Sequence, residues 1–68
     1  MQMTLKAARV NVGLSRGEAA KMLGVNTKTL LNYEQGIALP RIDLVKRMLA
    51  LYGVSLDEVN FYPETTIK

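Results

Sequence analysis

The amino-acid sequence predicts an all-α domain of five short helices. Apolar residues recur at helical spacing in several segments, beginning with Leu5, Ala8 and Val12. The segments start after helix-capping residues or end at glycines, and both prolines fall outside them. With 68 residues, the chain has room for one small domain and one core.

Turn and capping residues set the expected limits of these helices. Ser15 followed by Glu18 forms an S-x-x-E capping box, and Asn26 is a good cap for the helix after it. Glycine after a helical pattern favours a left-handed stop, which predicts ends at Gly24 and Gly53. The predicted helices cover residues 3–12, 15–23, 27–35, 41–52 and about 55–60.

Residues 16–35 form the most specific pattern, a helix, a tight turn and a second helix. Ala20 is small enough for two helices to approach closely, Gly24 ends the first helix, and Val25 can fill the corner. Other apolar residues at contact positions are Ala19, Leu23, Leu30 and Tyr33. This segment resembles the helix-turn-helix of lambda repressor and Cro-like (XRE) DNA-binding regulators. The resemblance covers about residues 4–60 of a single domain, 1–68, and leaves a short tail, 61–68, without a helical pattern.

Composition and charge exclude several classes of function. The chain has no cysteine and no histidine, so it lacks thiol nucleophiles, imidazole bases and the commonest zinc ligands. We therefore expect no enzyme, no metal or other cofactor and no small-molecule ligand. No apolar run approaches the roughly 20 residues of a membrane span, and residues 1–12 lack a signal-peptide block, so we expect a cytoplasmic protein. The net charge of +3 is uneven, with +4 in residues 1–33 and −1 in residues 34–68, which favours a nucleic-acid partner at the helix-turn-helix.

The helix at 27–35 has one packing face and one free polar face. At 100° per residue, Thr27, Lys28 and Asn32 fall on the free face, and their donors and acceptors suit base edges in a major groove. The resemblance implies that these three residues read bases and that Leu31 covers a thymine methyl. It also implies phosphate contacts, which fall on Arg16, Asn26 and Arg41. The family typically has Gln at the position of Arg16.

Arg9 lies beside the apolar stripe of the first helix, where an arginine normally needs a carboxylate partner. Glu34 is the candidate, and the resemblance implies the same pair, although both residues could instead be ordinary surface charges. The loop residues Ile37 and Leu39 depart from the usual polar loop of the family. Either they fold into the core or they belong to a contact surface.

The expected function is sequence-specific binding of double-stranded DNA by a phage-type or XRE-type repressor. A homodimer is expected because one recognition helix contacts only a few base pairs. The candidate dimer face, which could alternatively complete a monomer core, consists of Leu51, Leu56, Val59 and Phe61. The alternative function is a protein-interaction module, such as an antitoxin-like partner, which would use apolar residues outside the clearest core pattern, namely Ile37, Leu39, Leu44 and Leu51.

Overall fold

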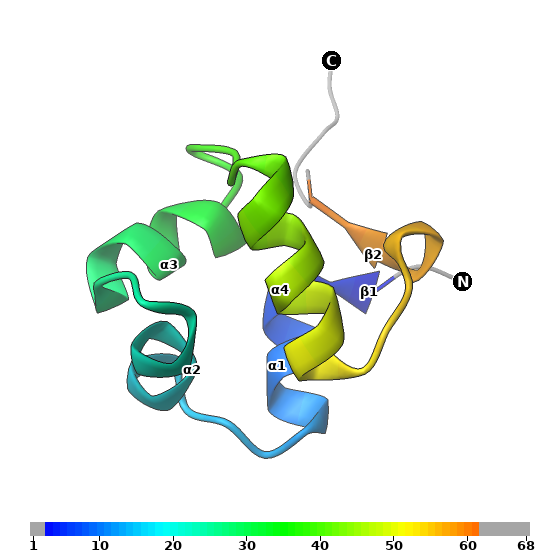
Figure 1. Ribbon diagram of the computed structural model, residues 1–68, viewed down its shortest axis with the longest axis horizontal. Coiled ribbons are helices and arrows are strands. Elements are labelled where there is room, and N and C mark those ends of the chain that lie inside the picture. Colours follow the sequence, from blue (N-terminus) through cyan, green and yellow to red (C-terminus); the bar gives the residue numbers. More distant parts are fainter. Residues whose placement is uncertain (1–2, 62–68) are drawn as a thin grey trace.

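The computed structural model describes residues 3–61, and within them it contains four α-helices, a single 3-10 turn and two short strands (Figure 1). In chain order the elements are β1 (Met3–Thr4), α1 (Leu5–Asn11), α2 (Arg16–Leu23), α3 (Thr27–Glu34), α4 (Ile42–Tyr52), η1 (Leu56–Glu58) and β2 (Val59–Asn60). The helical class predicted from the sequence is confirmed. Apart from Phe61, the predicted tail at 61–68 lies outside the described residues.

The predicted fifth helix is wrong, because only the single 3-10 turn η1 forms there. Its start is capped, since the Ser55 backbone N–H donates to Glu58 Oε1 at 2.8 Å. The helix cannot continue because Val59 has an extended backbone, with φ −118° and ψ 132°. Val59 belongs instead to β2, which pairs in parallel with β1 through the register Met3 with Val59. Pairing between distant parts of the chain therefore overrides the local helical pattern.

The same pairing shortens the first helix, which was expected over residues 3–12. Met3 and Thr4 form β1, and Thr4 becomes the N-cap of α1, where its Oγ1 accepts a hydrogen bond from Ala7 N at 3.0 Å. A hydroxyl acceptor at this position satisfies an amide that has no partner within the helix. The sheet thus joins the two ends of the described chain.

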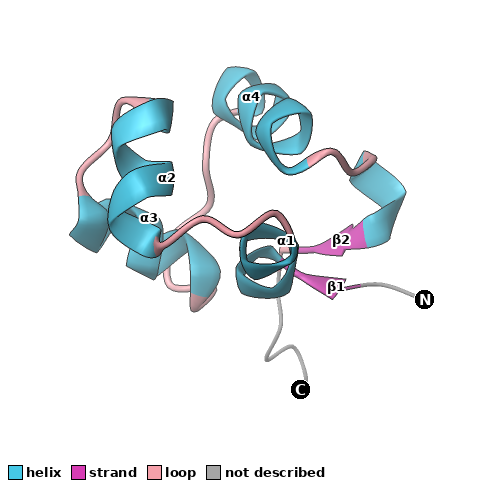
Figure 2. Cartoon of the chain, turned by 90° about the horizontal axis from the view of Figure 1, so that it is seen from below, coloured by secondary structure: helices cyan, strands magenta, loops and turns pink. Residues whose placement is uncertain are grey.

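α1 is the central element of the packing. It contacts α3, α4 and both strands, so that it lies between the sheet and the helix-turn-helix (Figure 2). The core combines small residues where helices approach closely with larger aliphatic and aromatic groups. Its members are Leu5, Ala8, Ala19, Ala20, Leu23, Leu30, Met48, Tyr52 and Val59. Within residues 3–61 the helices are too short and too polar for any of them to cross a membrane.

Three apolar side chains between α3 and the first turn of α4 lie at the surface. Ile37 is 69% exposed, Leu39 is 52% exposed, and Ile42 is 66% exposed. Ile42 therefore does not belong to the core, and the first buried residue of α4 is Val45. For Ile37 and Leu39, exposure agrees with the contact-surface alternative and excludes burial in the core.

Candidate nucleic-acid interface

The turn between α2 and α3 is held by backbone and side-chain hydrogen bonds. Gly24 has φ +75°, a left-handed conformation that L-residues with a side chain rarely adopt, and its N–H caps the carbonyls that end α2. Val25 N then donates to Ala20 O at 3.0 Å. Asn26 begins α3, because its Oδ1 accepts a hydrogen bond from Thr29 N at 2.9 Å. These contacts fix the direction in which α3 leaves the turn.

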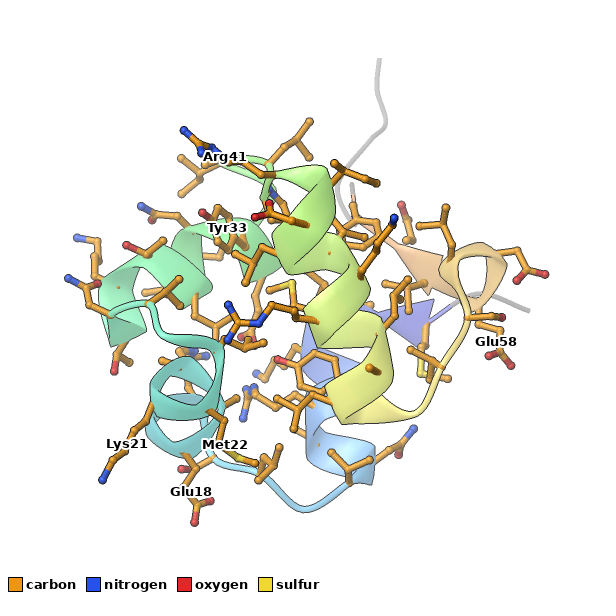
Figure 3. The ribbon with its side chains drawn as sticks, in the orientation of Figure 1. Glu18, Lys21, Met22, Tyr33, Arg41 and Glu58 are labelled. Carbon is orange, nitrogen blue, oxygen red and sulfur yellow. The ribbon has the colours of Figure 1, made fainter. Side chains whose placement is uncertain are left out.

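At the other end of α2, the predicted capping box is present. Ser15 Oγ accepts from Glu18 N at 3.1 Å, and the Glu18 carboxylate accepts from Ser15 N at 2.8 Å. The hydrogen bond from the Ser15 backbone N–H to this carboxylate, and after it the Ser15 hydroxyl, hold the pKa of Glu18 below its ordinary value. In Figure 3, Glu18 and Lys21 extend outward from α2. The start of α2 is therefore ordered before any partner binds.

α3 has one buried face and one open face. Leu30 and Glu34 are buried, whereas Thr27 and Lys28 are exposed. Leu31 and Asn32 are half-buried and lie between the two faces. The polar residues predicted to contact bases are Thr27, Lys28 and Asn32. Within residues 3–61 their side chains form no hydrogen bonds, so their donors and acceptors are available to a ligand.

The three predicted phosphate contacts differ in how much of each side chain is free. Arg41 is exposed at the N-cap of α4, makes no side-chain capping bond, and lies at the edge of the molecule (Figure 3). Asn26 uses its Oδ1 as a helix cap, which leaves its amide NH₂ group. Arg16 is the first residue of α2 and is partly exposed, but its Nε donates to Glu34 Oε1 at 3.2 Å.

The structure contains the contact expected between Arg9 and Glu34. Arg9 Nε lies 2.7 Å from Glu34 Oε2, with the two side chains only 6% and 2% exposed. A second Arg9 donor, Nη1, bonds Leu14 O at 2.9 Å. The pair therefore joins α1 to α3 in a buried place, where each charge depends on its partner.

Comparison with known proteins agrees with this geometry. A family model described as helix-turn-helix matches residues 5–59, which is most of the chain. The chain belongs to this helix-turn-helix family. The XRE-type resemblance predicted from the sequence is thus confirmed.

Two curated proteins are similar to this chain. The chain is 33% identical to the cryptic phage CTXphi transcriptional repressor RstR of Vibrio cholerae, over 93% of this chain and 57% of the relative. It is 38% identical to the HTH-type transcriptional regulator ImmR of Bacillus subtilis (strain 168), over 78% of this chain and 42% of the relative. The chain spans about half the length of these curated relatives. No solved structure gave a significant match.

Sequence reasoning missed the second partner of Glu34. It treated Arg16 as a phosphate contact alone, whereas Arg16 also donates to the carboxylate that neutralises Arg9. The available signal was the departure from the helix-turn-helix pattern, since Arg replaces the usual Gln at this position. Arginine has enough N–H donors to bond two partners at once, and it carries a positive charge that glutamine lacks.

Tyr52 on α4 lies near enough to this ion pair for both of its charges to act on the phenol. Its side chain is buried, and within residues 3–61 its hydroxyl has no hydrogen-bond partner. Burial raises the pKa of Tyr52 to about 12; the Glu34 carboxylate acts in the same direction and Arg9 opposes it. The phenol therefore stays neutral at physiological pH.

The predicted dimer residues do not form one exposed face. Val59 is buried in the core of the monomer, and Leu51 and Phe61 are half-buried against that core. Leu56 alone among the four is exposed. Val59 in particular completes the core of the monomer, because it belongs to β2 and is buried in one cluster with residues of the four helices.

Proposed function

We propose that this domain binds double-stranded DNA sequence-specifically as a transcriptional repressor, with α3 in the major groove. The observation that supports this function best is the free polar face of α3. The turn at Gly24 and Asn26 fixes this helix in place, and the chain belongs to the helix-turn-helix family. In this motif the second helix enters the groove and the first crosses the DNA backbone. The two relatives are named as a transcriptional repressor and a transcriptional regulator, which supports the same function.

Base reading is assigned to the free face of α3. Thr27 and Asn32 present uncharged donors and acceptors, and Lys28 adds a flexible positive charge. Asn32 is suited to a bidentate contact with adenine, because its amide has one donor side and one acceptor side. Leu31 is half-buried beside these residues, where a thymine methyl would cover its remaining surface.

Phosphate binding is assigned to three residues beside this face, Arg16, Asn26 and Arg41. Arg41 is exposed, and its guanidinium has no partner within the described chain, residues 3–61; Asn26 retains an NH₂ donor. Contacts of this type hold a protein on any duplex, whereas base contacts choose among sequences. Mutations of the phosphate-binding residues should therefore lower affinity for every duplex, whereas mutations of the base-reading residues should lower sequence preference.

The experiment compares Asn32→Ala with Arg41→Ala on a preferred site and on random duplex DNA at several salt concentrations. Asn32→Ala should cost ~1–3 kcal/mol on the preferred site and relax its preference at one base pair, with an unchanged salt slope. Arg41→Ala should weaken both complexes and lower the slope of log K against log salt by about one. Asn11→Ala and Lys46→Ala are matched controls on exposed positions of α1 and α4. Equal losses on both DNAs from Asn32→Ala would overturn the base-reading assignment.

We further propose that two copies bind one operator, with the protein acting in the cytoplasm where its DNA is found. Two half-sites about one helical turn apart would supply specificity that one short recognition helix lacks. Leu56 is the exposed member of the predicted dimer face. Sedimentation of the protein with a selected site should show two chains per duplex, and one chain on every selected site would exclude the dimer.

A further inference from the structure

Glu34 is shared by two arginines from two other helices. Arg9 of α1 donates through Nε to Oε2 at 2.7 Å, and Arg16 of α2 donates through Nε to Oε1 at 3.2 Å. The carboxylate itself is on α3, with its side chain only 2% exposed. One buried group therefore connects all three helices that precede the α3–α4 loop.

The two arginines use their donors differently. Arg9 is buried, and its Nε, Nη1 and Nη2 all donate within the protein, to Glu34 and to Leu14 O. Arg16 is bound only through Nε, and its side chain is 32% exposed. Within residues 3–61 its two Nη groups make no hydrogen bond. Arg16 is thus anchored at one edge of its guanidinium and open at the other.

The cluster of Arg9, Arg16 and Glu34 carries a net positive charge, which lies on its exposed side. Two guanidinium groups and one carboxylate leave the cluster with one uncompensated positive charge, and Arg9 is too buried to present it. The charge is therefore presented by Arg16, which is the first residue of α2. In the proposed function α2 crosses the DNA backbone, so that a phosphate would meet the free edge of this guanidinium.

We propose that Glu34 is a positioning residue, which holds Arg16 through Nε so that its Nη groups are aimed at a DNA phosphate before the DNA arrives. The inference rests on the proposed function, since the phosphate belongs to bound DNA. Holding a long side chain in its bound geometry removes the ordering cost that an untethered arginine would meet on binding. The geometry favours arginine, because a rigid guanidinium can bond the carboxylate through Nε and direct its Nη groups at a phosphate, whereas lysine carries all its donors on one nitrogen of a flexible stem.

A double-mutant cycle on affinity for duplex DNA tests the positioning. Arg16→Lys keeps the charge but loses the Nε donor, so it should weaken binding about tenfold while leaving the salt slope unchanged. In a Glu34→Gln background, confirmed as folded by circular dichroism, the same change should cost less than about twofold. Arg41→Lys is the matched control, since Arg41 has no carboxylate partner among residues 3–61 and should respond equally in both backgrounds.

A measurement without DNA separates this inference from the proposed function. Nuclear magnetic resonance relaxation should show the Arg16 Nε–H bond ordered, with an order parameter near ~0.85 in the wild type and below ~0.6 in Glu34→Gln. A mobile Arg16 Nε–H in the wild type, or an Arg16→Lys effect that is the same in both backgrounds, would overturn the positioning role. Wild-type protein that binds no duplex DNA at low salt would instead overturn the proposed function and the phosphate contact with it.

Discussion

Removing either partner of the Arg9–Glu34 pair should destabilise the domain, and by unequal amounts. Breaking a buried ion pair from one side usually costs ~3–5 kcal/mol, because the remaining charge stays buried without compensation. Glu34→Leu should show this full cost, since among the described residues it leaves Arg9 with Leu14 O as its one remaining acceptor. Arg9→Met should cost less, about 2–3 kcal/mol, because Glu34 keeps the partly exposed Arg16 at 3.2 Å.

These costs are large for a chain of this size, whose total stability is expected to be roughly 3–10 kcal/mol. Urea unfolding at neutral pH should measure them, with trimethylamine N-oxide added equally to all samples so that Glu34→Leu remains folded. The double mutant Arg9→Met with Glu34→Leu should be more stable than Glu34→Leu alone, because no buried charge is left unpaired. Lys46→Met on the exposed side of α4 is the control. Two small effects that add within ~0.5 kcal/mol would refute the reasoning.

Four further substitutions test the local structure. Ser15→Ala should lower the free energy of unfolding by ~1 kcal/mol in a urea titration. Because the folded-state pKa of Glu18 is lowered, its ionised carboxylate stabilises the fold above pH 4.5, and this stabilisation is lost as pH falls through the folded-state pKa. The mutant should therefore lose less stability than the wild type on acidification. Tyr52→Phe should not reduce stability at neutral pH, because the buried hydroxyl has no partner within the described chain. Wild-type stability should fall between pH 10 and about 12, where the unfolded state loses the phenol proton first, and the mutant should lack this fall. Gly53→Ala should cost ~1–2 kcal/mol because φ is +70°, whereas Gly17→Ala, in a helix with equal space around it, should stabilise by up to ~1 kcal/mol; a similar thermal shift for both would contradict the argument.

The helix-turn-helix was predictable because its signals are local. The Ser15 capping box, the left-handed Gly24 and the Asn26 cap each act within a few residues, and all three occur where the sequence placed them. The parallel strands were not predictable, since Met3 and Val59 pair across nearly the whole described chain and neither segment alternates long enough to indicate a strand.

The candidate site shows the same division between local and distant information. Helical spacing alone separates the buried Leu30 from the exposed Thr27 and Lys28 on α3. The contact between Arg16 and Glu34 depends on how α2 crosses α3, which spacing does not specify. The exposure of Ile37 likewise could not be predicted from the sequence. Whether an apolar loop residue is buried depends on where the next helix starts.

The central claim, sequence-specific DNA binding through α3, is tested most directly by selecting bound fragments from random duplex DNA. The wild-type protein should enrich a short sequence, repeated as two half-sites about one helical turn apart. Selection with Asn32→Ala should recover the same site with the preference lost at one base pair of each half-site. Fragments indistinguishable from the starting pool, or an Asn32→Ala selection identical to the wild type, would contradict the account, and the first result would favour a protein-interaction module instead.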